Sequence, residues 1–246
     1  MNILVIGESC KDVFVYGDCS RLCPEAPIPV LNYSETKETQ GMAANVVNNL
    51  YSCGADNVVL ATNNNVIKKV RYIDRKTNYM LLRVDENDHV DSTFNFDNVD
   101  FSAYDAVVVS DYCKGFLTEA ILREISYKHK LTFLDTKKPL STWALNFSYI
   151  KINETEWNKS IKAGANAIDW GNKLIVTKGD LGCDYNGKNY PVEKVSMKDV
   201  SGAGDTFLAV LVFAFLQSNN IEFAIKCANE AATIVVQKKG VSVPYE

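Results

Sequence analysis

The chain has 246 residues, of which 47% are hydrophobic, and a formal net charge of −4 at pH 7. That composition can bury one large core, and the negative charge gives no general attraction to nucleic acid or to anionic membranes. Seven cysteines without a C-x-x-C pair, together with two histidines, suggest neither a disulfide framework nor a zinc site. The N-terminus has no basic segment and only a short apolar run, so we expect a cytoplasmic chain without a signal peptide or a membrane span.

Short apolar runs alternate with helical patterns along the chain. We expect buried strands at 2–7, 57–61, 106–110, 131–135, 149–153 and 173–177, and helices at 41–53, 117–129, 154–163, 202–217 and 221–237. This alternation predicts an α/β fold with a mostly parallel central sheet and helices on both faces. Ligands of such sheets bind at the carboxyl ends of the strands.

Two stretches break the alternation of strands and helices. Residues 12–36 and 68–96 show period-two alternation with turns and no helix, which predicts strands with one solvated face. They could form a small sheet that projects from the main body, or a pair of ordinary edge hairpins. We expect residues 1–246 to be a single domain that carries these two segments.

Polar residues follow the first strand and open the first helix. Asp12 could hydrogen-bond substrate hydroxyls, although a lone aspartate in a turn is more often structural. In "QGMAANVVNNL" the small side chains allow close approach at Gly41, and Asn45 could face the same pocket. A simple helix entry explains this segment equally well.

The ends of the strands at 149–153 and 173–177 also carry polar residues. Asn153 and Glu156 form an N-x-x-E pattern on a first helical turn, where Glu156 could hold Mg²⁺ directly or through water. An ordinary helix cap has the same pattern. Thr177, Gly179 and Gly182, in "VTKGDLGCDY", suit a turn against the phosphates of a nucleotide, and a simple hairpin turn is the alternative.

The segment "VSGAGDTF" opens a helix that is apolar on most sides. One interpretation is a capped helix, with Ser201 as the N-cap and Asp205 complementing the helix dipole. A dinucleotide-binding turn is excluded, because Phe207 stands where the third glycine should be. A third interpretation is an anion site at the helix N-terminus, where Gly202 and Gly204 leave the backbone accessible. Asp205 would then take a proton from the hydroxyl that attacks a phosphate.

Together and in this order, the motifs resemble those of the ribokinase (PfkB) family of carbohydrate kinases. "DVSGAGDTF" (199–207) is similar to the family signature D-T-x-G-A-G-D-x-F, and residues 228–244 resemble the segment that follows it. "QGMAANVV" (40–47) resembles the family's G-G-x-x-x-N motif and "NETE" (153–156) its N-x-x-E motif. The resemblance spans nearly the whole chain.

The resemblance implies a role for each matching position. Asp205 would be the catalytic base, and the N–H groups of Gly202, Ala203 and Gly204 would form the anion hole. The two alternating stretches would be a β-sheet lid, through which relatives commonly form homodimers. The ligands of sugar hydroxyls would be Asp12, Gly41 and Asn45; Asn153 and Glu156 would organise Mg²⁺ and the phosphates; and ATP would contact Thr177, Gly179, Gly182 and Asn229.

Three further strings resemble one branch of the family, the D-glycero-D-manno-heptose 7-phosphate kinases. They are "SRLCPEAPIPVL" (20–31), "LLRVD" (81–85) and "SDYCKGFLT" (110–118). The resemblance implies transfer of phosphate from ATP to the anomeric hydroxyl of this heptose phosphate. Arg83 and Lys114 lie in these strings and are candidate cations for its 7-phosphate.

The chain departs from the family at two places. Gln40 replaces the first glycine of the family's pair, and a helix-containing segment of the relatives is missing near residue 65. Both changes affect the sugar side, so two alternatives stay open. The chain could phosphorylate another sugar, of the fructose or ribose type, or it could be a non-catalytic relative that binds a nucleotide or a sugar.

Overall fold

The computed structural model describes residues 1–246 except 98, 239 and 246, and it contains two separate sheets. The strands are β1 (Asn2–Gly7), β2 (Ser9–Leu22), β3 (Pro29–Met42), β4 (Asn57–Ala61), β5 (Ile67–Asp74), β6 (Met80–Glu86), β7 (Ala106–Asp111), β8 (Thr132–Thr136), β9 (Tyr149–Asn153), β10 (Leu174–Thr177), β11 (Cys183–Tyr185) and β12 (Lys188–Tyr190). The α-helices are α1 (Ala43–Ser52), α2 (Glu119–Lys128), α3 (Glu154–Lys162), α4 (Ala167–Trp170), α5 (Ala203–Ser218) and α6 (Ile221–Val235).

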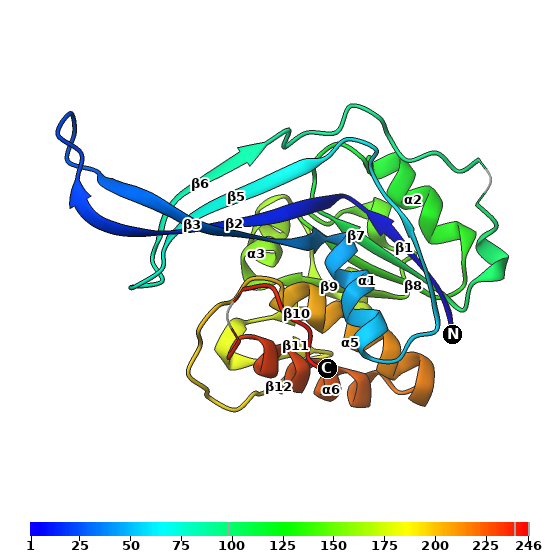
Figure 1. Cartoon of the computed structure of the whole chain (residues 1–246). Helices are drawn as coiled ribbons and strands as arrows, with labels where there is room; N and C mark the ends of the chain where they lie inside the picture. Colours follow the sequence, from blue (N-terminus) through cyan, green and yellow to red (C-terminus); the bar gives the residue numbers. More distant parts are fainter. Residues whose placement is uncertain (98, 239, 246) are drawn as a thin grey trace.

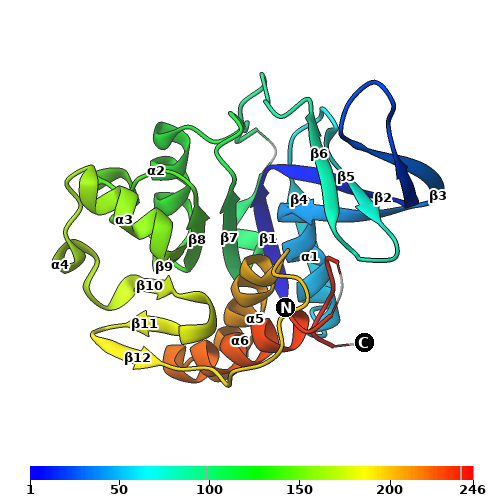
Figure 2. The same cartoon turned by 90° about the vertical axis from the view of Figure 1, so that its left-hand side faces the viewer.

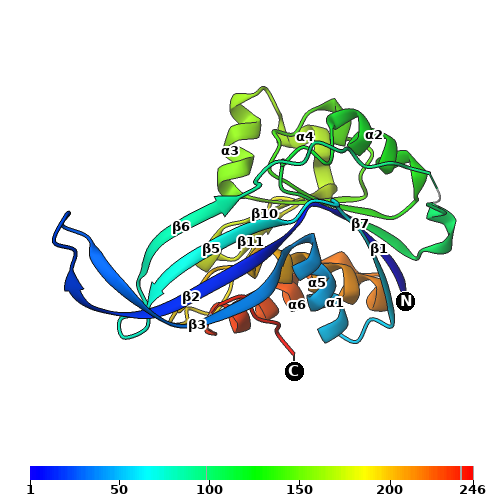
Figure 3. The ribbon, with the colours of Figure 1, turned by 45° about the horizontal axis from the view of Figure 1, so that its top comes forward.

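The main sheet has eight strands in the order β12-β11-β10-β9-β8-β7-β1-β4. The six strands from β10 to β4 pair in parallel, and β11 and β12 add an antiparallel edge. Helices α2, α3 and α4 lie on one side of this sheet and α1, α5 and α6 on the other (Figure 3). The predicted fold class, a mostly parallel sheet with helices on both faces, is confirmed.

The hydrophobic runs form strands because both faces of the main sheet are covered. Along β1, Ile3 and Val5 pack into the core under α1, α5 and α6, whereas Leu4 and Ile6 pack into the core on the opposite face. A strand that is buried on both faces has no polar positions, which is why its sequence reads as a continuous apolar run. Helix α5 is apolar nearly all round because it packs between α1 and α6 against this sheet (Figure 2).

The second sheet has four strands in the order β3-β2-β5-β6 and projects from one side of the molecule (Figure 1). It consists of two antiparallel hairpins, joined by parallel pairing of β2 with β5. The alternating stretches therefore form a small sheet rather than separate edge hairpins, and we call this sheet the lid. Residues 87–96 of the second stretch continue beyond β6 without forming a strand.

The interpretation of Ser201 as the N-cap of α5 is wrong, because the N-cap lies one residue later. Gly202 occupies the N-cap of α5 with φ 82°, and no side chain caps this helix end. The chain must turn through the left-handed region here, which a glycine adopts without strain and a serine does not. The N–H of Ser201 instead donates to Asp199 Oδ1 at 2.8 Å.

Candidate active site

Asp205 lies in the first turn of α5 and is buried. Its Oδ2 accepts a hydrogen bond from Asn45 Nδ2 at 2.9 Å, and its Oδ1 accepts one from the Tyr112 hydroxyl at 2.7 Å. Burial raises the pKa of Asp205 to about 6, against the lowering effect of these two hydrogen bonds and of the Lys151 charge. A carboxylate with a pKa near neutrality is suited to accept a proton at physiological pH.

A cavity of about 290 Å³ opens beside Asp205. Gly202 and Gly204 line it, so the N-terminus of α5 borders this space. No side chain of the described residues caps this helix end, and the Ala203 N–H donates to the Val200 carbonyl at 3.3 Å, so the first-turn N–H groups other than that of Ala203 are available to an anion. Two lysines, Lys137 and Lys151, line the same cavity.

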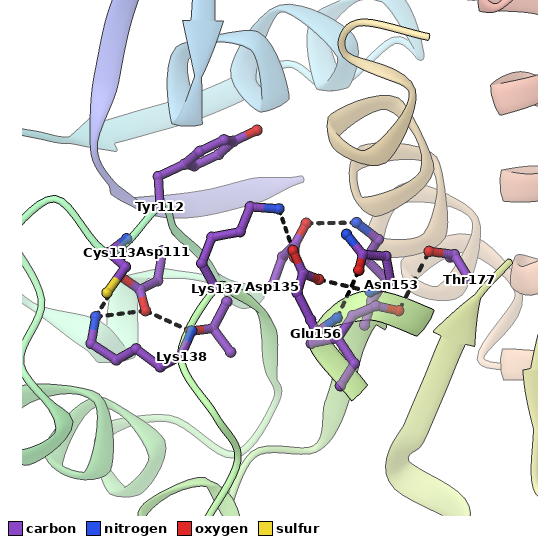
Figure 4. Close-up of polar contacts among 12 residues, drawn as sticks. Asp111, Tyr112, Cys113, Asp135, Lys137, Lys138, Asn153, Glu156 and Thr177 are labelled. Atoms are coloured by element: carbon purple, nitrogen blue, oxygen red, sulfur yellow. Dashed lines mark hydrogen bonds and ion pairs between the residues drawn. The ribbon is translucent and has the colours of Figure 1, made fainter. Parts of the chain in front are cut away.

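Polar side chains lie in and beside this cavity at the carboxyl ends of the four neighbouring strands β7 to β10 (Figure 4). Lys151 Nζ donates to Asp135 Oδ2 at 2.7 Å, and Lys137 Nζ donates to Glu156 Oε1 at 2.5 Å. Farther along, Lys138 Nζ donates to both oxygens of Asp111 at 2.8 Å. Each of these three lysine charges is therefore neutralised by a neighbouring carboxylate.

Asn153 and Glu156 form the helix cap; Asn153 lines the cavity, and Glu156 lies behind Lys137, which lines it. The Asn153 side chain accepts from the N–H of Glu156 at 2.9 Å, and Glu156 Oε2 accepts from the N–H of Asn153 at 2.7 Å. The capping interpretation is therefore correct for this pair. The second carboxylate oxygen of Glu156, Oε1, accepts a hydrogen bond from Lys137.

The residues at this site are suited to a Mg²⁺ ion that arrives bound to a nucleotide. They are less suited to a metal ion held by the protein alone. Within the described residues no group of three His, Cys, Asp or Glu side chains is placed to hold a metal. Glu156 offers one buried carboxylate that is held in a fixed orientation by the helix cap. Magnesium commonly binds one or two carboxylates plus phosphate oxygens and water, and this single carboxylate meets that requirement.

A second cavity, of about 170 Å³, adjoins the first and shares Thr177, Gly179 and Gly204 with it. Gly182 and Asn229 also line it, so the structure brings together the four residues predicted to contact ATP. The rest of the lining is mainly apolar and includes Val192, Val195, Met197, Phe207, Ala232 and Val236. An apolar slot that opens into a polar cavity suits a flat ring attached to an anionic group.

The lid contributes Asp12 on β2 and Gly41 on β3, which pair with neighbouring residues in the register. A Cβ atom at Gly41 would collide with the Asp12 carboxylate and with Cys10 Sγ, so a side chain here would displace the Asp12 carboxylate. Asp12 is buried and forms an ion pair with Arg71 of β5. Helix α1 follows directly after the lid strand β3, and Asn45 in its first turn donates the hydrogen bond to Asp205.

Gln40 does not enter this region. Successive side chains of a strand point to opposite faces, and Gln40 pairs in register with Lys11, whereas Gly41 pairs with Cys10. Gln40 is exposed on the face opposite to Asp12. The loss of the family's first glycine therefore leaves the backbone approach at Gly41 intact.

Arg83 lies on the lid itself, and neither Arg83 nor Lys114 lines the cavity beside Asp205. Arg83 on β6 forms an ion pair with Asp85 at 2.7 Å and stands opposite Arg71 in the register, and Lys114 pairs with Asp88. Arg71 and Lys69 alternate along β5, so their side chains share the face of Asp12 and Arg83. We call Lys69, Arg71, Arg83 and Lys114 the lid cations.

Sequence reasoning missed Tyr112 and Lys69. The Tyr112 ring lies between two ammonium groups, with Lys69 Nζ 5.3 Å and Lys137 Nζ 5.2 Å from its centroid. Burial lowers the pKa of Lys69 and raises that of Tyr112. Tyr112 lies in the segment "SDYCKGFLT", and the alternation of Lys69 with Arg71 on one strand face was the available signal for Lys69.

Sequence reasoning also missed Glu8, the single residue between β1 and β2. Glu8 is fully buried, and its carboxylate accepts hydrogen bonds from the backbone N–H groups of Tyr112 at 2.8 Å, Lys114 at 2.9 Å and Phe116 at 3.2 Å. It therefore holds the loop that positions Tyr112. Burial, and secondarily the charge of Asp111, raise the pKa of Glu8.

Solved structures of known proteins identify the fold class of this chain. Ribokinase from Thermotoga maritima superimposes with a TM-score of 0.74 and 17% identity, covering 98% of this chain and 94% of that one. Phosphofructokinase-2 from Escherichia coli, solved in complex with potassium, gives a TM-score of 0.71 with 12% identity and covers 98% and 94%. These likenesses show a ribokinase-like fold.

A model of the pfkB family carbohydrate kinases matches residues 44–246. The chain therefore belongs to the pfkB family, a family of ATP-dependent carbohydrate kinases. It is 30% identical to the "Bifunctional protein HldE" of Helicobacter acinonychis over 97% of this chain, and 30% identical to that of Campylobacter jejuni over the whole chain. It spans 63% of the length of each of these two relatives. No helix in the described part of the chain is both long and apolar enough to cross a membrane.

Proposed function

We propose that the chain transfers the γ-phosphoryl group of ATP to the anomeric hydroxyl of D-glycero-D-manno-heptose 7-phosphate. The observation that carries this proposal is that Asp205 lines the cavity at the α5 N-terminus and also accepts a hydrogen bond from Asn45, in the first turn of the helix that follows Gly41 of the lid. The relatives named HldE, at about 30% identity, support the heptose assignment. The base, the anion site and the acceptor site are then three neighbouring parts of one arrangement.

In the proposed reaction, ATP lies along the two joined cavities with its γ-phosphate at Gly202–Gly204. The acceptor hydroxyl approaches Asp205 Oδ1, where the Tyr112 hydroxyl donates in the present structure. Its proton passes to Asp205 as its oxygen bonds to phosphorus, and the bond from phosphorus to the ADP oxygen breaks. Mg²⁺ held by Glu156, directly or through water, would neutralise charge on the phosphates when bound.

The lid cations support an acceptor that carries its own negative charge. Lys69 and Arg71 share the lid face of Asp12, and Arg83 stands beside Arg71. Lys69 is buried, which is costly for an ammonium group that has no carboxylate within ion-pair distance among the described residues. A phosphate on the acceptor would compensate that charge.

The test is Mg²⁺-dependent ADP release with the heptose 7-phosphate, compared with sedoheptulose 7-phosphate, fructose, fructose 6-phosphate and ribose. In the Lys69→Met variant we expect the KM for the phosphorylated acceptor to rise about 10- to 100-fold, since a hydrogen bond to a charged group is lost. The matched control is Lys68→Met, because Lys68 points to the opposite face and pairs with Glu86. Turnover of another sugar alone would support the kinase activity but show that the heptose 7-phosphate is not the substrate. If the protein binds ATP but phosphorylates none of these acceptors, it is a non-catalytic relative.

We also propose that the chain forms a homodimer through the lid. Leu82 and Val84 alternate along β6 and are both exposed, which places two apolar side chains on one face of the projecting sheet. We expect light scattering to give twice the chain mass for the wild type and one chain mass for Leu82→Glu. Ile168→Glu, at an exposed position on α4, is the control. A wild-type monomer at all concentrations would contradict the proposal.

A further inference from the structure

Lys151 is a buried lysine at the end of a main-sheet strand. It lies in the apolar run "YIKIN" of β9, and 5% of its side chain is exposed. Its ammonium group has three N–H donors, and within the described residues its one hydrogen-bond acceptor is Asp135 Oδ2, at 2.7 Å. Burial of an ammonium group is expensive, so its position requires a reason.

The ammonium group lies directly over the first turn of α5. A Cβ atom built on Gly204 would stand 2.9 Å from Lys151 Nζ, and both residues line the 290 Å³ cavity with Asp205. The positive end of this 16-residue helix and a lysine charge therefore meet at one point. A glycine at position 204 leaves room for the ammonium group to reach that point.

Stability alone does not account for the pair of Lys151 with Asp135. Buried ion pairs seldom stabilise a protein more than apolar residues of the same volume would. Asp135 Oδ1 is also buried and has no hydrogen-bond partner among the described residues, so the pair is incompletely satisfied. An incompletely satisfied charged pair beside an anion-sized cavity is typical of a binding site.

We propose that Lys151 is a catalytic residue whose ammonium group donates a hydrogen bond to the phosphoryl group in transfer. This assignment rests on the proposed kinase function. Lys151 stays protonated throughout: the acceptor oxygen bonds to phosphorus, the bond to the ADP oxygen breaks, and the acceptor proton goes to Asp205. The lysine stabilises the charge on the phosphoryl oxygens together with the helix N-terminus.

The rival explanation is that Lys151 only neutralises Asp135. The double variant Lys151→Met/Asp135→Asn distinguishes the two explanations. It removes both charges and leaves no unpaired buried carboxylate. The matched control is Lys138→Met/Asp111→Asn, because that pair also lies largely buried at neighbouring strand ends but does not line the cavity. Thermal unfolding of both variants establishes that they are folded.

The measurement is calorimetric affinity, with Mg²⁺ and no acceptor, for ADP and for the β,γ-imido analogue of ATP. We expect the Lys151 double variant to lose about 10- to 100-fold in affinity for the analogue, which carries the γ-phosphate, and less than about threefold for ADP. The control variant should retain the wild-type ratio of the two affinities. A Lys151 double variant with that same ratio would overturn the assignment. Wild-type protein that binds neither nucleotide would overturn the kinase function itself.

Discussion

Asp205→Asn is expected to lower kinase turnover about 10²- to 10⁴-fold, the usual loss when a positioned general base is removed. The asparagine fills the same volume in the buried first turn of α5 but cannot accept the acceptor proton at neutral pH. Folding and ATP binding should be retained, because neither depends on the negative charge of this side chain. The measurement is steady-state ADP release under saturating substrates, with nucleotide affinity measured in parallel.

The pH dependence of the wild type provides the accompanying control. The pKa of Asp205 is raised to about 6 by burial, and the base is active only when it is unprotonated. Turnover should therefore be complete above this pKa and fall as the pH is lowered through about 6. Near-normal turnover of Asp205→Asn at neutral pH would show that another group takes the proton.

Glu8→Ala is expected to destabilise the fold by roughly 3–5 kcal/mol, because three buried N–H groups lose a charged acceptor at once. The loop that it holds is conformationally strained: Cys113 has φ 58° although it is not glycine. Without the Glu8 carboxylate the loop relaxes, and Tyr112 is displaced from Asp205. The measurement is the free energy of unfolding in urea.

Two further variants of glutamate make the Glu8 prediction specific. Glu8→Gln keeps one acceptor oxygen and should lose less stability than Glu8→Ala. Glu124→Ala removes an exposed glutamate that pairs with Lys128 on α2, and its effect should stay within about 0.5 kcal/mol. Equal stabilities for Glu8→Ala and Glu124→Ala would show that Glu8 does not hold the loop.

The main sheet could be predicted from sequence because its strands are buried on both faces. The predicted ranges 2–7, 57–61 and 149–153 match β1, β4 and β9 at both ends. The range 131–135 is displaced by one residue from β8: the apolar Leu131 precedes the strand, and the strand continues to Thr136, which is buried but not apolar. The short elements α4, β11 and β12 were not predicted, since three or four residues contain too little periodicity.

The candidate site was predictable where a motif places a residue at a strand end or a helix start. Thr177, Gly179, Gly182 and Asn229 line one cavity, and Asn45 contacts Asp205. Tyr112, Lys151 and Glu8 could not be found in this way, because their surroundings come from segments that are distant in sequence. Their partners are identified only after the loop, the strand and the helix have been packed together.

The contact between Asn45 and Asp205 joins residues that are 160 positions apart, and Thr206 Oγ1 contacts Asn49 Oδ1 across 157 positions. Both contacts form only when α1 docks onto α5, and closing so long a loop is entropically costly. Contacts of this separation form slowly compared with local ones. The proposed base therefore acquires its setting only in the nearly complete fold, and we expect the recovery of turnover during refolding to report the completion of the whole chain.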